Sequence, residues 1–325
     1  MADLHKAENQ FQQMITECRN DPVRPVPTIN DKILSTPQKI LQAAYETHRT
    51  NRNASFRDQI HQPGFHQWKK DEILHQVLEA ESGLTDYVDP RNNLAYWARP
   101  PRHVRDLVYK IQQEIGALIG SSLWLVPSDN LHMTTLEISS EQPADQIRKL
   151  TEAMDSKLTQ ELANYTLNHR VRLVKPIISY DTSAIALSFV PAAGEDDFSE
   201  YSGNDDRYTY HHLRRDLYDK VTMSGISIAA RYTVPSAHIT IARFVQPVGA
   251  TEVELESPEV IEQKANQLVA KIEVLNGELR SNVWRRLGDP SQGEWVVGHE
   301  KGLEFMWGTT WYGKGESIVL GNGFV

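Results

Sequence analysis

The strongest constraint on the fold is a segment that occurs twice in the chain. The first copy reads LWLVPSDNLHMTTLEI and the second ISIAARYTVPSAHITIARF. Each has an apolar run, a Val-Pro-Ser turn, and a second run in which apolar and polar residues alternate. Alternation with a period of two predicts half-buried strands, and the Pro and Ser residues between the runs predict turns. A unit that occurs twice indicates two similar lobes.

The rest of the chain predicts helices and further strands around these two units. The expected strands are residues 94–100, 171–179, 184–190, 305–313 and 316–325. The expected helices are residues 36–45, 68–81, 103–119, 144–162, 208–223 and 258–275. The prediction is an α+β fold: bilobal and duplicated, with two antiparallel-rich sheets facing a central groove, helices on the outside, and a helical N-terminal arm.

These segments divide the chain into a helical N-terminal extension, residues 1–93, and a main domain, residues 94–325. The main domain is predicted to contain interleaved lobes of roughly 94–165 and 170–325. Because both repeated units lie beyond the extension, deletion of residues 1–90 is expected to leave a soluble protein.

Composition restricts the partners and the compartment. The 34 basic and 43 acidic residues give a net charge of −9, the wrong sign for a protein that grips long nucleic acid. A small phosphorylated nucleotide or an RNA end needs only a local basic pocket. Cys18 is the single cysteine, and the start of the chain lacks the apolar stretch of a signal peptide. We therefore expect a cytoplasmic protein without a membrane segment, whose oligomeric state stays open.

The pattern His-x-Thr occurs three times. In two copies, His132 to Thr134 and His238 to Thr240, it lies in a strand-like run after a Val-Pro-Ser turn. Because side chains alternate along a strand, the histidine and threonine of each copy share one face. The third copy, at His48, lies in the polar string ETHRTNRN, and we interpret it as a chance match. Strict alternation also turns Arg243 away from the histidine face.

Two such pairs suit phosphodiester chemistry. Histidine titrates near neutrality, so one imidazole can accept a proton from the attacking oxygen while the other delivers one to the leaving oxygen. The hydroxyls of Thr134 and Thr240 can hold the nonbridging phosphate oxygens. The reaction needs neither metal nor cofactor, and two histidines without a nearby Cys or paired carboxylate are a poor metal-ligand set. The alternative is an inactive duplicated fold with two hydrogen-bonded strand histidines.

The segments LHMTTLEI and AHITIARF resemble the signature strands of the 2H (two-histidine) phosphoesterase superfamily, which includes LigT-like RNA ligase/cyclic nucleotide phosphodiesterases. The family motif is a hydrophobic residue, His, any residue, Thr or Ser, and a hydrophobic residue. The second copy matches throughout, whereas the first has Thr135 at the last position. The resemblance covers about residue 93 to the C-terminus. The acidic stretch 194–206 is the expected insertion between the motifs.

The resemblance implies a metal-independent phosphodiesterase acting on a 2',3'-cyclic phosphate or related cyclic nucleotide. In this mechanism His238 would activate water and His132 would protonate the departing 3'-oxygen. Two alternatives remain: an RNA-end ligase or 3'-end-trimming phosphodiesterase on the same scaffold, and a non-catalytic nucleotide- or RNA-binding module. Tyr312, near the closing strand, is a candidate for base stacking. With ordinary histidine pKa values near 6.5, activity should be greatest around neutral pH.

Overall fold

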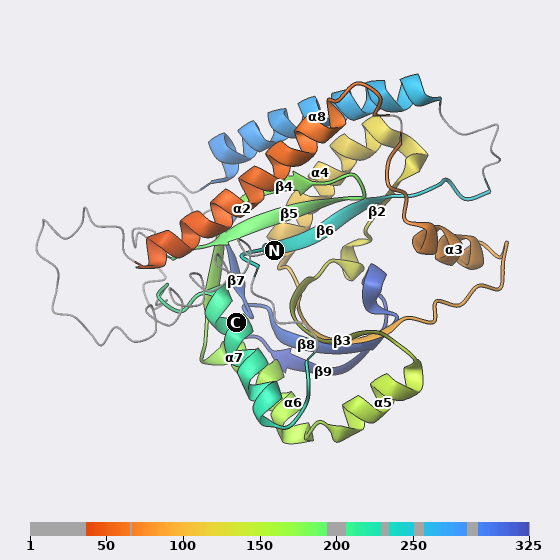
Figure 1. Ribbon diagram of the computed structural model, residues 1–325. Helices are drawn as coiled ribbons and strands as arrows, with labels where there is room; N and C mark the ends of the chain where they lie inside the picture. Colours follow the sequence, from red (N-terminus) through yellow and green to blue (C-terminus); the bar gives the residue numbers. More distant parts are fainter. Residues whose placement is uncertain are drawn as a thin grey trace, which may run out of the picture.

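The computed structural model describes residues 37–65, 67–193, 206–228, 234–249, 257–284 and 292–324 (Figure 1). Its helices are α2 (Pro37–Ile60), α3 (Glu72–Glu81), α4 (Arg102–Ile119), α5 (Ala144–Ala153), α6 (Ser156–Ala163), α7 (Tyr210–Met223) and α8 (Pro258–Glu278). Its strands are β1 (Asn92–Ala98), β2 (Leu123–Leu125), β3 (Met133–Gln142), β4 (Val171–Tyr180), β5 (Ala184–Pro191), β6 (Ala237–Phe244), β7 (Trp295–Val297), β8 (Lys301–Gly308) and β9 (Glu316–Asn322).

The strands form two antiparallel sheets that lie one above the other in Figure 1. The lower sheet has the order β3-β1-β8-β9 and the upper sheet the order β2-β6-β5-β4-β7. Helices α4 and α8 cover the outer side of the upper sheet, α2 packs on β4 and β5, and α5 and α6 pack on the lower sheet. Helix α7 contacts both β3 and β4, so it joins the two layers. The predicted α+β class, with two antiparallel sheets and outer helices, is confirmed.

The two strands of the first repeated unit belong to different sheets. β2 pairs with β6 in the upper sheet, whereas β3 pairs with β1 in the lower sheet. Between them the chain crosses from one layer to the other, and the Val126 amide donates to the Ile241 carbonyl at 3.0 Å. The buried Gln112 amide donates to the carbonyls of both Val126 and Ile241 at 2.8 Å. The crossing delivers His132 to the start of β3, where the two layers meet.

Several predicted boundaries were wrong, for local reasons. The expected helix 144–162 is two helices, because Met154 is extended and Asp155 caps a new helix by accepting from the Lys157 amide at 2.8 Å. The expected helix 68–81 begins at Glu72, because Asp71 caps it in the same way. The strand β7 was missed because three residues carry no readable periodicity.

Two further expectations fall mainly where the structure gives no description. In the second copy, residues 226–228 are in no strand, and residues 229–233 lie outside the described residues. The acidic stretch expected as an insertion also lies outside them, apart from Asp206.

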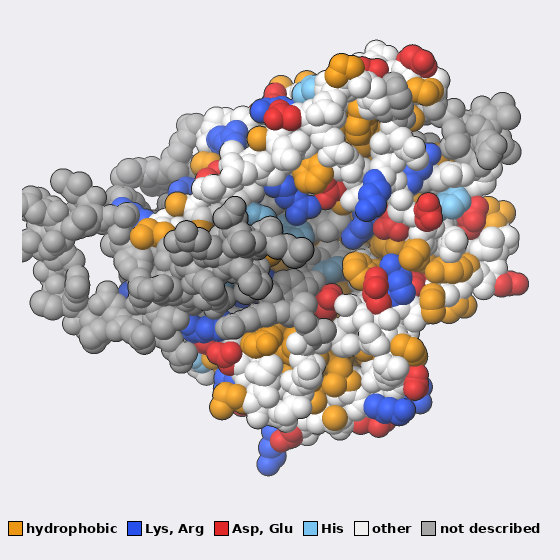
Figure 2. All heavy atoms as spheres, in the orientation of Figure 1, with side chains coloured by type: hydrophobic (Ala, Val, Ile, Leu, Met, Phe, Trp, Pro, Cys, Tyr) orange, Lys and Arg blue, Asp and Glu red, His pale blue; other side chains and the backbone are white. Residues whose placement is uncertain are grey.

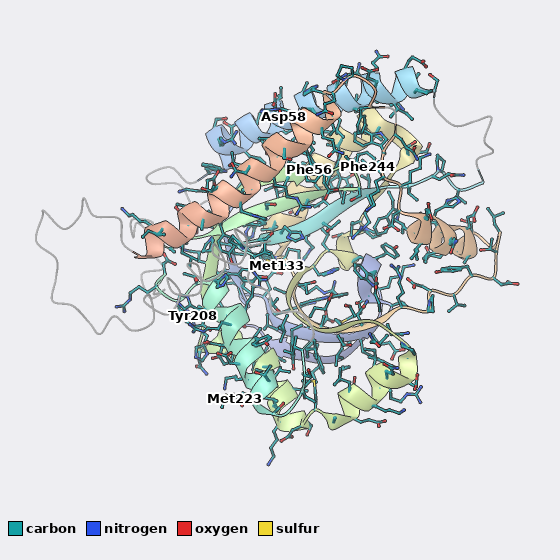
Figure 3. All side chains as sticks on the ribbon, viewed as in Figure 1. Phe56, Asp58, Met133, Tyr208, Met223 and Phe244 are labelled. Atoms are coloured by element: carbon teal, nitrogen blue, oxygen red, sulfur yellow. The ribbon has the colours of Figure 1, made fainter. Side chains whose placement is uncertain are left out.

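The described part of the N-terminal extension packs against the upper sheet. Helix α2 runs to Ile60 rather than ending at residue 45, and its buried face includes Leu41 and Tyr45. After it, the Trp68 ring stacks on Phe244 with centroids 3.9 Å apart. Figure 3 shows Phe244 on the helix-covered side of the upper sheet. These buried contacts make α2 and the following loop part of the hydrophobic core.

Candidate active site

His238 lies on β6, an inner strand of the upper sheet. Its neighbours Ala237 and Ile239 are buried on the helix side, whereas His238 and Thr240 are on the other face and reach a pocket. The pocket has a volume of about 700 Å³, including its open mouth. The sequence-based expectation that His238 and Thr240 share a face therefore agrees with the burial pattern of the strand.

A β-bulge directly follows this motif. Ala186 of β5 pairs with Thr240 and Ile185 pairs with Ala242, so Ile241 has no partner of its own in β5. Two successive residues, Ile241 and Ala242, are consequently both buried, and the alternation shifts by one.

The bulge brings Arg243 onto the face of His238 and Thr240, where it lines the same pocket. The prediction that Arg243 points away from the histidine face was wrong, because it assumed strict alternation. Arg243 is held by Asp71 at 3.3 Å, and its guanidinium lies 5.7 Å from the centre of the Tyr312 ring.

The first motif has the same irregularity. Trp97 of β1 pairs with Thr134 and Tyr96 pairs with Leu136, which leaves Thr135 as the extra residue. Thr135 is fully buried and its hydroxyl donates to the Tyr96 carbonyl at 2.8 Å. The departure of Thr135 from the family motif is thus accommodated inside the bulge, and its polar group has a partner.

His132 is fixed by two neighbours, Asn130 and Trp97. Its Nδ1 lies 2.8 Å from the Asn130 carbonyl oxygen. Because a carbonyl only accepts, Nδ1 carries the hydrogen and Nε2 of the neutral ring is left as an acceptor. The ring stacks on Trp97 with centroids 3.7 Å apart, and the Arg99 guanidinium lies 4.8 Å from the centre of the Trp97 ring.

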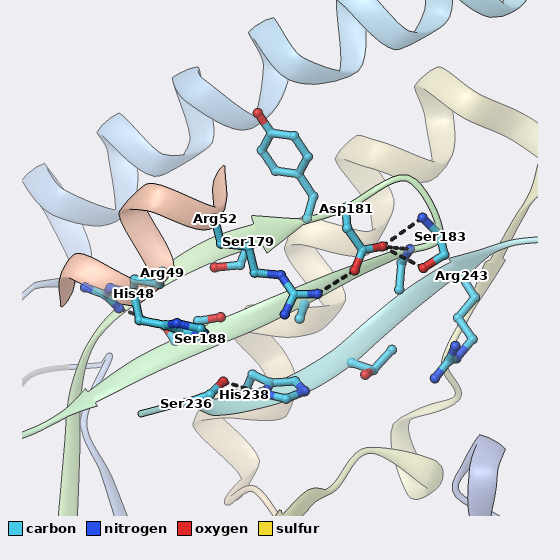
Figure 4. Close-up of a pocket in the computed structure, with 14 residues that line it drawn as sticks. His48, Arg49, Arg52, Ser179, Asp181, Ser183, Ser188, Ser236, His238 and Arg243 are labelled. Carbon is cyan, nitrogen blue, oxygen red and sulfur yellow. Dashed lines mark hydrogen bonds and ion pairs between the residues drawn. The ribbon is translucent and has the colours of Figure 1, made fainter. Parts of the chain in front are cut away.

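His238 is held in a parallel way, by a group two residues upstream. Its Nδ1 lies 3.0 Å from the Ser236 hydroxyl, which can donate or accept (Figure 4). Arg214 of α7 donates to the Val234 carbonyl at 2.9 Å and so supports the turn before β6. In both motifs Nδ1 is engaged with the preceding turn, and Nε2 is the nitrogen left for a substrate.

The two imidazoles share an electropositive environment that favours their neutral forms. Displacement of water by surrounding protein lowers the pKa of His132 to about 3, although its bond to Asn130 acts in the opposite direction. The same displacement lowers the pKa of His238 to about 4, although the residue itself is exposed to solvent. The charges of His238 and Arg243 contribute to the shift at His132, and β3, which follows His132, contacts β6, which carries His238.

The described pocket does not contain every predicted residue. It brings together His238, Thr240 and Arg243, whereas His132, just before β3, and Thr134, on β3, are not among its lining residues. The Thr134 carbonyl accepts from Tyr210 of α7 at 3.0 Å. Figure 2 shows histidine and basic side chains around the hollow in the middle of this face.

The sequence reasoning missed two pocket residues on α2, His48 and Arg52. The interpretation of the third His-x-Thr as a chance match is corrected in one respect: His48 sits on a helix, not a strand, yet that helix carries it to the pocket. Arg52 donates to Asp181 at 2.6 Å across the pocket wall (Figure 4). A signal was present, because His48 and Arg52 are four residues apart and therefore on one helix face.

Tyr312 is buried beside Arg243. It is 5% exposed, and the guanidinium groups of Arg91 and Arg243 lie 5.8 and 5.7 Å from its ring centre. Its hydroxyl donates to Asp71 at 2.8 Å. These contacts make Tyr312 part of the support for Arg243, and its role in base stacking stays a prediction.

The described residues contain no group of three or more His, Cys, Asp or Glu side chains arranged to hold a metal ion. Within the same residues, no helix combines the length and the apolar character needed to cross a bilayer.

The fold is similar to those of several solved structures. ATU0111 of Agrobacterium tumefaciens, described as a conserved protein of unknown function, is 14% identical over 71% of this chain and 86% of its own, with a TM-score of 0.42. LigT of E. coli is 14% identical over 50% of this chain and 77% of its own (TM-score 0.29). Usb1 of Kluyveromyces marxianus, solved with uridine monophosphate, is 10% identical over 72% of this chain and 98% of its own, with a TM-score of 0.36. No protein family model and no curated protein matches the chain. At these identities and scores, the likenesses assign no role to any residue here.

Proposed function

We propose that this protein is a metal-independent phosphodiesterase of the two-histidine type, which hydrolyses a 2',3'-cyclic phosphate or related cyclic nucleotide. The observation that carries the proposal is the matched placement of His132 and His238. Each follows a turn, each has Nδ1 engaged two residues upstream, and each leaves Nε2 for a ligand. One such nitrogen can take the proton of an attacking water while the other protonates the leaving oxygen.

The supporting residues fit a phosphate between the two histidines. Thr240 faces the pocket with His238, and Arg243 brings a positive charge to the same face. A phosphate anion at this position raises the pKa of both imidazoles, because an opposite charge favours the protonated form. Bound substrate thereby creates the singly protonated pair that the reaction needs. In the proposed roles His238 is the base and His132 the acid.

The direct test is turnover of the four 2',3'-cyclic mononucleotides in the presence of EDTA, with wild type compared to His132→Ala. We expect hydrolysis by the wild-type protein and a strong loss in the variant. If no phosphodiester is turned over with or without added metal, a nucleotide-binding module replaces the proposal. Formation or trimming of RNA ends without cyclic-phosphate hydrolysis would instead favour the ligase or trimming alternative on the same residues.

The pH profile should differ from that of ordinary histidines. In the free protein the pKa values of about 3 and about 4 leave both rings neutral above pH 5. Above pH 5, the fraction of free protein with one of the two histidines protonated then falls roughly tenfold for each unit of rising pH. The value of kcat/KM should therefore fall at that rate between pH 5 and 8. The value of kcat, which reports the substrate complex, should change less. A maximum of kcat/KM near neutral pH would contradict the lowered pKa values.

The threonines should matter less than the histidines. Thr134→Ala and Thr240→Ala each remove a hydroxyl expected to donate to a phosphate oxygen, which should lower kcat/KM by roughly 10- to 100-fold. Thr151→Ala is the matched control, because its hydroxyl bonds only within α5, to the Ile147 carbonyl. Steady-state kinetics that show no change for Thr134→Ala or Thr240→Ala would mean that the two motifs do not present their threonines to the substrate.

A further inference from the structure

Beyond His238, the pocket extends over β5 to the face of α2. Its wall there is formed by His48 and Arg52 of the helix and by hydroxyl side chains of the sheet, among them Ser179 and Ser188 (Figure 4). This part of the pocket takes no role in the two-histidine chemistry. Its residues are nevertheless held in defined positions.

Helix α2 is attached rigidly enough to present these side chains. Arg49 is 4% exposed and donates to the carbonyls of Lys175 at 2.6 Å and Ser188 at 3.1 Å. One turn further on, the Asn53 amide donates to the Ile178 carbonyl at 3.0 Å. These bonds join α2 to β4 and β5 directly after each of the two helix residues, His48 and Arg52, that reach the pocket.

Three guanidinium groups line the pocket, those of Arg49, Arg52 and Arg243. Asp181 is the single carboxylate among the described lining residues. It already accepts from the Ser183 amide and hydroxyl and from the Ala184 amide, at 2.7–2.8 Å, besides its ion pair with Arg52. Arg52 is 46% exposed, so its guanidinium can bind a ligand while it keeps Asp181.

The buried hydroxyl of Ser179 is a further feature of this wall. Ser179 lines this wall and is 6% exposed, and its Oγ has no hydrogen-bond partner among the described residues. Buried polar groups are almost always hydrogen-bonded, and an oxygen of a bound ligand would satisfy this one after a small shift of the side chains that cover it. The positive charge beside it favours an anion.

We infer that His48, Arg52 and Ser179 form a second anion-binding subsite, which holds a second phosphate of the substrate next to the one between the histidines. The inference rests on the proposed function and names its substrate class: a cyclic phosphate whose nucleotide carries a further phosphate. That group is either a 5'-phosphate on the same nucleoside or the adjoining phosphodiester of a short RNA end. Both present the same anionic oxygens to Arg52.

The kinetic test compares three substrates: a nucleoside 2',3'-cyclic phosphate, the same compound with a 5'-phosphate, and a dinucleotide ending in the cyclic phosphate. Wild type should prefer a substrate with a second phosphate, and Arg52→Gln should reduce that preference in kcat/KM by roughly 10- to 100-fold. His48→Gln should reduce it less. Because all three substrates use the same histidines, any effect of Arg52 on His238 cancels in this ratio.

The matched control is Arg57→Gln, an exposed arginine of α2 that pairs with Glu273 at 3.4 Å, away from the pocket. It should leave the preference unchanged. A preference for the 5'-phosphorylated mononucleotide identifies that phosphate as the occupant, and a preference for the dinucleotide alone identifies the internal phosphodiester. An equal kcat/KM for all three substrates, or a preference that survives Arg52→Gln, would overturn the inference.

A binding measurement separates this inference from the proposed function. Calorimetry should compare a nucleoside 2'-monophosphate, a nucleoside 2',5'-bisphosphate and a dinucleotide with a terminal 2'-phosphate, on wild type and Arg52→Gln. Tighter binding of one of the last two, lost in the variant, supports the subsite even if no substrate is hydrolysed. Equal affinities for all three ligands would contradict the second anion-binding subsite even if hydrolysis is confirmed.

Discussion

His132→Ala and His238→Ala should each lower kcat on a 2',3'-cyclic nucleotide by roughly 10²- to 10⁴-fold, the usual range for loss of a general acid or base. Because the two rings act on one phosphate as a unit, the double variant should be little worse than the poorer single variant. Both folds should survive, because His238 is exposed and His132 is half-buried. Steady-state kinetics with circular dichroism on the same samples checks both statements.

His61→Ala is the control for these variants. His61 is an exposed histidine just after α2, and its Nδ1 lies 2.7 Å from the Asn266 side-chain oxygen. A loss of activity in His61→Ala comparable to that in the other two would show that the assay reports general damage. Near-normal kcat in either His132→Ala or His238→Ala would remove that histidine from the mechanism.

The roles of the two histidines can be separated with a better leaving group. A substrate with sulfur in place of the 3'-oxygen needs less protonation as it departs. It should therefore rescue His132→Ala, the loss of the proposed acid, far more than His238→Ala, the loss of the proposed base. Equal rescue, or the reverse order, would overturn the assignment of roles but not the two-histidine mechanism.

Deletion of residues 1–90 should leave a chain without a cooperative unfolding transition. The deletion removes five large side chains that are each at most 2% exposed: Leu41, Tyr45, Ile60, Trp68 and Leu74. At about 1.5–3 kcal/mol for each buried side chain, the loss is roughly 8–15 kcal/mol. A typical domain has only about 5–15 kcal/mol of stability. The sequence alone led us to expect a soluble truncated protein. The buried side chains of residues 1–90 instead predict that the truncated chain does not fold.

Point variants test the same claim without truncation. Trp68→Ala removes the ring stacked on Phe244 and should cost about 3–5 kcal/mol in the free energy of unfolding. Lys69→Ala, at the exposed neighbouring position, should stay within about 0.5 kcal/mol of wild type. If the truncated protein melted within a few degrees of the full chain, or Trp68→Ala behaved like Lys69→Ala, the N-terminal helices would not belong to the core.

Local patterns predicted the parts of this site that depend on local geometry. The alternation around His238 gave both the strand and the face shared with Thr240. It failed at Arg243, because a bulge is set by pairing with β5 and not by the strand itself. The adjacent apolar residues Ile241 and Ala242 were the available signal, since strict alternation would have buried only one of them.

The contribution of α2 to the pocket could not be predicted from local sequence patterns. His48 and Arg52 reach the pocket because Arg49 bonds to carbonyls more than 100 residues away in the chain, at Lys175 and Ser188. Such a contact is a property of tertiary packing, and helical periodicity shows only which residues share a face. The crossing of the chain between β2 and β3 was missed for the same reason, because sheet membership depends on distant partners.

The central claim is that His132 and His238 contact one phosphate together. The direct measurement is a nuclear magnetic resonance titration of the histidine side chains, with and without a saturating nucleoside 2'-monophosphate, assigned with His132→Gln and His238→Gln. In the free protein both pKa values should lie well below 6.5, at about 3 for His132 and about 4 for His238. The bound phosphate should raise both, because its charge favours both imidazolium forms. A rise at only one histidine, or at neither, would contradict the account.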